Sequence, residues 1–309
     1  IDFTGSSANG NWLEENARQA QVYTEKAGVN QVIIDSVEDI KGVARNLAFS
    51  FALYSGQMCT APQNVYVPRS GISTAEGHLS FDDVAAALAQ AVDKLTADPA
   101  RAVEITGAVQ NQGTLDRIEE AKGLGLPVLS DSRPLEHPQF AGAQVRTPLI
   151  LKADADNEAI LREWFGPIVF VVATDSTEES IQLAARTVVQ HGALTLAAYT
   201  TDDAVAKAVQ KAAERSGVSL SLNLTGGVFV NQTAAFSDFH GTGSDFGGWL
   251  FGIARNHGAN AARRRATRVR GQETLRNQLQ PFDPGPEVHL IADEWLRQAL
   301  AMLPPRERD

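Results

Sequence analysis

Short apolar runs of strand length alternate with amphipathic helical segments up to about Asn231, and this alternation constrains the fold more than any other feature of the sequence. The segment 81–95 is rich in alanine and places its apolar residues at helical spacing. The segment 168–173 is apolar throughout, which is typical of a buried strand. The sequence therefore predicts layered helices and strands of the α/β class.

The expected elements can be placed from residue patterns and capping signals. Ser36 followed by Asp39 predicts a capping box for a helix whose apolar face runs from Val37 to Phe51, and Ser176 with Glu179 predicts another. Beyond Ser244 the periodicity ends, lysine is absent and ten arginines face eight acids, so we expect a poorly packed tail. Further helices are expected at 9–20, 111–121 and 202–213, and strands at 2–4, 21–24, 31–34, 65–67, 128–129, 148–151, 194–199, 218–222 and 228–230.

Composition excludes several classes of protein. A net charge of −10 argues against a chain built to cover nucleic-acid phosphates, and no apolar run approaches the roughly 20 residues of a membrane helix. One cysteine cannot form an internal disulfide, and the start at Ile1 lacks the features of a signal peptide, so we expect a cytoplasmic protein. The six histidines show no paired spacing of the kind that a zinc site needs, and we expect no metal.

Two residues are candidates for covalent chemistry. Cys59 follows Gly56-Gln57 at the end of a long predicted helix and before a strand, where a thiol can be held at a crevice. A thiol of lowered pKa attacks a carbonyl carbon to give a hemithioacetal. Glu25 ends a predicted strand and could accept a proton from water. Taken alone, an inert buried cysteine and a solvated acid explain the same residues.

Four motifs in order are more specific than either residue. They are Phe3-Thr4-Gly5-Ser6, then Glu25 with Gly28, then Gly56-Gln57-Met58-Cys59, and then Glu163-Trp164-Phe165-Gly166-Pro167. This order, with 34 positions from Glu25 to Cys59, resembles the aldehyde dehydrogenase superfamily. The resemblance implies a three-layer α/β catalytic domain at 29–230, a remnant of a Rossmann-like cofactor domain at 1–28, and a substrate-facing loop with a divergent tail at 231–309.

The resemblance also implies a role for each matching residue. Cys59 takes the place of the nucleophile, with its backbone N–H as an oxyanion donor, and Glu25 that of the base that activates the deacylating water. NAD or NADP is the implied cofactor and accepts the hydride. Its pyrophosphate and nicotinamide are expected at Thr4, Gly5 and Ser6, its ribose at Glu163, and its ring beside Phe165.

Departures from the family pattern suggest a branch. Lys26-Ala27-Gly28-Val29 replaces the usual Leu-Gly-Gly-Lys after Glu25, and residues 236–243 replace the usual Pro-Phe-Gly-Gly turn. This variant is similar to the phenylacetic-acid-degradation branch, which acts on a CoA-linked semialdehyde produced by ring opening. Phe239 and His240 are then expected to face the substrate. The parent protein is expected to be a homo-oligomer with a small-molecule aldehyde as its partner, and no nucleic acid or membrane.

The family's oxyanion asparagine and most of its cofactor domain have no counterpart here, so we expect a C-terminal fragment that is inactive alone. Two alternatives stay open. A CoA-acylating enzyme would share the fold but usually lacks the deacylating glutamate, which is present here as Glu25. A non-catalytic remnant or dimerisation module would carry a slow Cys59 thiol, whereas a preserved active site is expected to show a fast, acid-shifted thiol.

Overall fold

A computed structural model describes residues 1–232, and its centre is a seven-stranded sheet. All neighbouring strands in this sheet run parallel except the last pair, β11 and β8. In spatial order the strands are β14 (Ser219–Leu222), β13 (Thr195–Tyr199), β3 (Gln31–Ile34), β5 (Asn64–Pro68), β12 (Ile168–Thr174), β11 (Leu149–Asp154) and β8 (Val128–Ser130).

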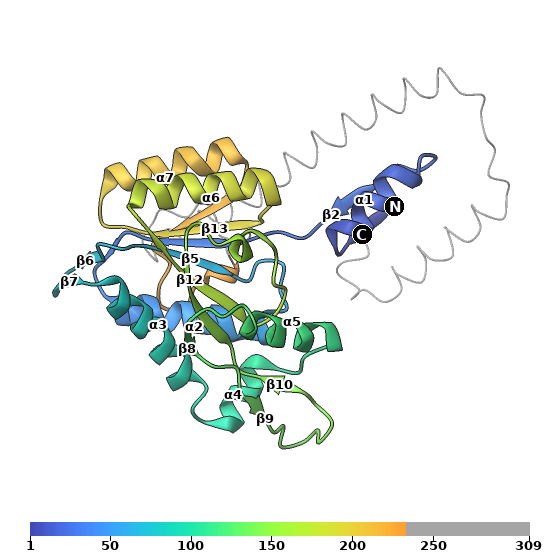
Figure 1. The fold of residues 1–309 in the computed structure, drawn as a ribbon, viewed down its shortest axis with the longest axis horizontal. Coiled ribbons are helices and arrows are strands. Elements are labelled where there is room, and N and C mark those ends of the chain that lie inside the picture. The colour runs from blue at the N-terminus through green and yellow to red at the C-terminus, as the bar shows by residue number, and fades with distance from the viewer. Residues whose placement is uncertain (233–309) are drawn as a thin grey trace, which may run out of the picture. The chain divides into compact units, whose positions relative to one another are not determined.

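Helices cover both faces of this sheet (Figure 1). One face carries α2 (Ile40–Ala52) and α3 (Phe81–Leu95), and the other carries α6 (Thr177–His191) and α7 (Asp203–Ser216). Successive side chains of β3 enter different cores, because Val32 and Ile34 belong to the core under α2 and Ile33 to the core under α6. The four central strands, β13, β3, β5 and β12, are buried at every position and are mostly apolar, because both of their faces are covered. The predicted three-layer α/β architecture is confirmed.

Smaller elements surround the central sheet. β1 (Asp2–Thr4) and β2 (Tyr23–Glu25) form a parallel pair connected through α1 (Ser7–Asn16). The others are α4 (Pro99–Thr106), α5 (Gln112–Lys122), β4 (Ser36–Val37), β6 (Ile72–Thr74), β7 (Gly77–Leu79), β9 (Pro134–Leu135), β10 (Val145–Arg146), and the short 3₁₀ helices η1 (Leu53–Gly56), η2 (Glu158–Leu161) and η3 (Val230–Gln232). No helix within residues 1–232 combines the length and apolar character needed to cross a membrane.

The capping box predicted at Ser36 is wrong. Ser36 lies in β4, where its Oγ accepts hydrogen bonds from the backbone N–H and the hydroxyl of Thr201, at 2.8 and 3.0 Å. The helix begins three residues later than the sequence pattern predicts, at Ile40. Asp39 caps it by accepting a hydrogen bond from the N–H of Lys41 at 2.8 Å. Because Ser36 and Val37 both pair with β6, the helix cannot begin directly after Ser36, and Asp39 is the side chain in position to satisfy its first free N–H groups.

Two other predicted elements also differ. The predicted strand 228–230 is not a strand, since the carbonyl of Val228 accepts the side-chain amide of Asn46 at 2.6 Å and Val230 begins η3. The first helix runs from Ser7 to Asn16 because Ser6 caps it early and Ala17 leaves the helical region at φ −85° and ψ 49°. The expectations for Phe239, His240 and the tail lie outside the described residues, and the domain boundaries stay predictions.

Candidate active site

The loop that carries Cys59 has a strained turn at its start. Tyr54, Ser55 and Gly56 lie consecutively in the left-handed region, with φ of 53°, 53° and 61°. A residue with a side chain costs roughly 1–2 kcal/mol in this conformation, so neighbouring contacts must hold it. Ser55 is fully buried, and its Oγ donates to the carbonyl of Thr106 at 3.0 Å. The turn redirects the chain after α2 and leaves Cys59 exposed.

Gly56 fixes this loop against the loop of Glu163 and Phe165. A Cβ atom on Gly56 would lie 2.3 Å from the carbonyl oxygen of Gly166, so the two backbones touch where a side chain would stand. Gly166 itself has φ 146°. The contact therefore brings together two motifs that lie about a hundred residues apart in the sequence, Gly56-Gln57-Met58-Cys59 and Glu163-Trp164-Phe165-Gly166-Pro167.

Cys59 and Glu25 line one cavity of about 940 Å³. Glu25 is exposed at the end of β2, and its carboxylate lies close enough to the thiol to raise the thiol pKa. Glu163 and Phe165 line the same cavity, and so does Ser6. The structure thus places five of the predicted site residues around one cavity, although they come from four separate segments of the sequence.

The thiol has a raised pKa. Although Cys59 is exposed as a residue, partial burial of its thiol raises the thiol pKa most. The nearby Glu25 carboxylate raises this pKa further, and Glu163 contributes less. The thiol is therefore neutral at neutral pH, unlike the acid-shifted thiol expected of a preserved nucleophile. A neutral thiol still becomes a nucleophile when a neighbouring base removes its proton, and Glu25 is in position to do so.

Glu163 is half-buried, and its neighbours shift the pKa of its carboxyl group in opposite directions. Burial raises the pKa of this carboxyl, while the N–H of Gly28, at 3.3 Å, and the charge of Arg117 lower it. Arg117 also donates to the carbonyl of Phe165 at 2.9 Å and lines the cavity. No sequence signal marked Arg117, because it is one of several charged residues on α5 and belongs to none of the four motifs.

The predicted pyrophosphate turn lies beside Glu25. Thr4 pairs with Glu25 between β1 and β2, and the N–H of Gly5 donates to the Glu25 carbonyl at 3.0 Å. Ser6 caps α1 by accepting from the N–H of Asn9 at 3.3 Å, and it reaches the cavity. Thr4 and Gly5 do not line the cavity, so among these three residues only Ser6 lies at its wall.

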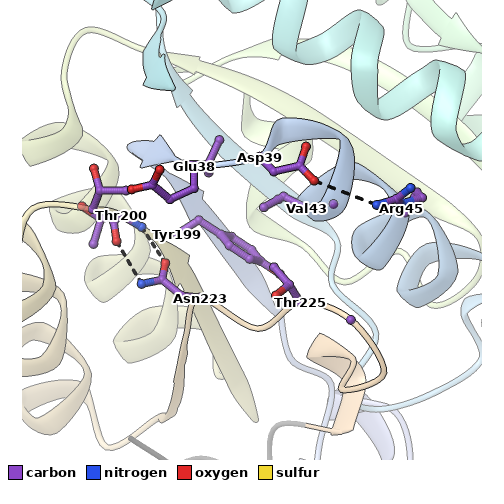
Figure 2. A pocket seen from close by; sticks show the side chains of 12 residues that line it. Glu38, Asp39, Val43, Arg45, Tyr199, Thr200, Asn223 and Thr225 are labelled. Carbon is purple, nitrogen blue, oxygen red and sulfur yellow. Dashed lines mark hydrogen bonds and ion pairs between the residues drawn. The ribbon is translucent and has the colours of Figure 1, made fainter. Parts of the chain in front are cut away.

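Figure 2 shows a second cavity, of about 380 Å³. It adjoins the carboxyl ends of β3 and β13, whereas Cys59 lies near the amino ends of these parallel strands. Thr200 and Asn223 exchange two hydrogen bonds at 2.9 Å, and Tyr199 donates to the Leu224 carbonyl. These polar groups are satisfied by one another, and none of the predicted site residues lines this cavity. Within residues 1–232, no group of three or more His, Cys, Asp and Glu side chains could hold a metal ion.

Comparisons with known proteins agree with this geometry. The aldehyde dehydrogenase family model matches residues 1–249. The N-succinylglutamate 5-semialdehyde dehydrogenase of Hahella chejuensis is 29% identical over 193 residues, which cover 60% of this chain and 37% of that protein.

Solved structures show the same relationship. A crystal structure of an NAD-dependent aldehyde dehydrogenase from Burkholderia multivorans superposes with a TM-score of 0.74 at 65% identity, covering 79% of this chain and 44% of that one. An indole-3-acetaldehyde dehydrogenase bound to NAD⁺ shares the fold at 20% identity and a TM-score of 0.57, over 74% of this chain and 45% of that one. The chain thus spans less than half the length of these relatives. With the family model matching most of its residues, the chain belongs to the aldehyde dehydrogenase family.

Proposed function

We propose that this chain carries the nucleophile and the general base of an aldehyde oxidation, in which aldehyde, water and NAD(P)⁺ give the acid. The observation that supports this most is that Cys59 and Glu25 line one open cavity, with the Glu25 carboxylate close enough to the thiol to raise its pKa. Family membership supports the reaction class. A site for covalent catalysis needs a nucleophile and a base in contact, and this pair meets that requirement.

In the proposed mechanism, Glu25 first takes the thiol proton and the sulfur attacks the aldehyde carbon. The backbone N–H of Cys59 donates to the oxygen that becomes negative. The bound cofactor supplies the hydride acceptor, which leaves an acyl group on the sulfur as a thioester. Glu25, which is exposed, releases this first proton to solvent and then accepts a proton from a water molecule. The hydroxide adds to the acyl carbon and displaces the thiolate as the acid forms, and the proton on Glu25 returns to the sulfur.

The residues around the cavity fit a nicotinamide cofactor. The cavity volume of about 940 Å³ lies in the range of small-molecule sites, about 300–1,000 Å³. Ser6 stands at the N-terminus of α1, where free N–H groups favour a phosphate. Glu163 offers a carboxylate that can accept hydrogen bonds from ribose hydroxyls. We propose NAD as the first choice over NADP, because the Burkholderia multivorans relative is described as NAD-dependent.

We further propose that the aldehyde is a CoA-linked semialdehyde from the opening of an activated phenylacetate ring. The support is the sequence of residues 230–243, which departs from the common family turn and is similar to that branch. Phe239 and His240 are the proposed substrate contacts. The test is the ratio of kcat/KM for the CoA-linked and the free semialdehyde in a protein of full family length. A ratio near one would contradict this substrate.

An activated ester tests the catalytic pair without any cofactor. The sulfur should attack p-nitrophenyl acetate, release p-nitrophenolate and leave an acetyl group on Cys59 that intact-mass spectrometry detects. Glu25→Gln should slow the loss of this acetyl group by about 10²–10⁴-fold, the usual contribution of a general base. An acetyl group that replaces a proton adds about 42 Da to the protein. Cys59→Ser should abolish this adduct at position 59.

Glu38→Gln is the matched control, because Glu38 lies at the second cavity. Its acetyl-enzyme should turn over at the parent rate. Normal deacylation by the Glu25→Gln variant would remove Glu25 from its proposed role. Failure of Cys59 to acylate at all would favour the non-catalytic alternative, and faster release of the acyl group to CoA than to water would favour a CoA-acylating enzyme.

A further inference from the structure

The side chain of Asn30 is buried beside the Cys59 loop and has all of its hydrogen bonds satisfied. Its Nδ2 donates to the carbonyls of Cys59 at 2.7 Å and of Ala61 at 3.1 Å. Its Oδ1 accepts from the N–H groups of Leu194 and Thr195, both at 3.0 Å. An amide side chain has two donors and two acceptor lone pairs, and all four are used here, with only 3% of the residue exposed.

The main chain of Asn30 also hydrogen-bonds the segment that follows Cys59. Its carbonyl accepts from the N–H groups of Gln63 and Asn64, at 3.0 and 3.2 Å, immediately after the Cys59 loop. Between Glu25 and Asn30, the N–H of Gly28 donates to Glu163. The segment from Glu25 to Asn30 is therefore hydrogen-bonded both to the Cys59 loop and to Glu163 in the loop of Glu163 and Phe165.

Contacts on the other side of the loop are weaker. Asn231 accepts a hydrogen bond from the Thr60 hydroxyl at 2.7 Å through its backbone carbonyl. Its side-chain Nδ2 reaches only the sulfur of Met58, at 3.8 Å, and its Oδ1 has no hydrogen-bond partner in the described part of the chain. Asn30 is thus the side chain that binds the peptide group of Cys59 itself.

We propose that Asn30 is a positioning residue, whose side-chain amide holds the Cys59 loop against the segment that carries Glu25 and so keeps the thiol and the carboxylate in contact. This inference rests on the proposed function of that pair. A displacement of about 1 Å at a reacting group can cost about 100-fold in rate, so hydrogen bonds that set this separation have a large effect. Asn30 touches neither the thiol nor the cavity, and it acts through the backbone of the loop.

The pH dependence of Cys59 reports the contact with Glu25. Removing the charge of Glu25 should lower the pKa of the thiol, because that charge raises it. The other charged groups are the same in the Glu25→Gln variant and its parent, so they do not affect the difference in thiol pKa between the two. The ionisable groups that line the same cavity are Glu25, Lys26, Arg117, Arg162, Glu163 and His191.

The experiment is a double-mutant cycle on the 309-residue chain, with Cys59 as its single cysteine. The rate of alkylation by iodoacetamide is measured from pH 6 to 10, a range of about two units on either side of the ordinary thiol pKa. Glu25→Gln is compared with its parent in three backgrounds, which are the unchanged chain, Asn30→Asp and Asn30→Ala. Asn30→Asp keeps both accepting positions for Leu194 and Thr195 and loses both donors to the Cys59 loop.

We expect Glu25→Gln to raise the rate severalfold at pH 8 in the unchanged chain, and to change it by less than about twofold in either Asn30 background. Asn64→Ala is the control, since Asn64 is also a buried amide but donates to Ile160 and Tyr66, away from the cysteine. It should lower stability while the full effect of Glu25→Gln persists.

Each outcome decides the proposal. An undiminished effect of Glu25→Gln in a folded Asn30 variant would overturn it, and unfolding of both variants would as well, because Asn30 would then be a general stabiliser of the fold. Absence of any effect in the unchanged chain would reject the thiol–carboxylate pair, and with it the proposed function. The two failures are therefore distinguishable.

Discussion

Gly56→Ala is the substitution for which the structure gives the sharpest prediction. The new Cβ would lie 2.3 Å from the carbonyl oxygen of Gly166, 2.6 Å from its carbon and 3.0 Å from the nitrogen of Pro167. Cβ atoms essentially never come within 3.0 Å of a neighbour, so the two backbones must separate by the difference between 2.3 and 3.0 Å, about 0.7 Å. Both loops carry site residues, so this displacement reaches Cys59 and Glu163.

Two costs contribute to the expected loss of stability. Alanine at φ 61° costs about 1–2 kcal/mol, and forcing apart packed backbone costs about 1–3 kcal/mol. The sum, about 2–5 kcal/mol, is a large part of the 5–15 kcal/mol that holds a typical domain folded. Gly217→Ala separates the two costs, because Gly217 lies in the left-handed region at φ 75° with nothing within 4 Å of a Cβ.

Urea unfolding followed by circular dichroism measures both variants, and alkylation of Cys59 reports the site. We expect Gly217→Ala to lose about 1–2 kcal/mol with unchanged thiol reactivity, and Gly56→Ala to lose about 1–3 kcal/mol more with an altered thiol pKa. Equal losses in the two variants would show that the contact with Gly166 costs nothing, and the proposed coupling between the two loops would then be wrong.

Three further variants test other features. Glu163→Gln should lower the pKa of Cys59 by less than Glu25→Gln does, because Glu163 contributes less to raising it, and alkylation profiles in the reverse order would contradict this. Ser80→Ala should cost about 0.5–2 kcal/mol in urea unfolding by removing the capping box of α3, and no loss would refute the box. Tyr199→Phe should cost about 0.5–1.5 kcal/mol, since its hydroxyl donates to Leu224 at 2.8 Å, and an unchanged midpoint would show that this bond is not stabilising.

The sequence predicted best where one physical requirement dominates. The helix at 81–95 has the same bounds in the structure, because Ser80 with Asp83 satisfies its first N–H groups and its apolar spacing matches a single buried face. The strand at 31–34 was also placed correctly, since three successive apolar residues, Val32 to Ile34, match burial on both faces. The capping box at Ser36 failed because Asp39, three residues later, had the same chemical ability to cap.

The site was only partly readable from the sequence. Motif order indicated Cys59, Glu25 and Glu163, which the structure gathers at one cavity. Asn30 and Arg117 carried no signal, because their partners lie far away in the sequence and a polar residue beside a strand or on a helix is ordinary. Long-range hydrogen bonds of this kind depend on how elements pack, and no local pattern encodes them.

Burial contributes most to the raised pKa of the Cys59 thiol, and the Glu25 carboxylate, the proposed base, raises it further. Glu25 can accept the proton of Cys59 only if it lies against the thiol, and a carboxylate at that distance disfavours the thiolate. A thiol of this kind is protected from indiscriminate alkylation and oxidation, which require the thiolate. It becomes reactive when a carbonyl carbon is present to receive the sulfur, since the proton then moves as the bond forms. The proximity of Glu25 to Cys59 therefore lowers the resting reactivity of the thiol and would supply the base for the proposed reaction, and any cationic group brought into the cavity would shift this balance toward the thiolate.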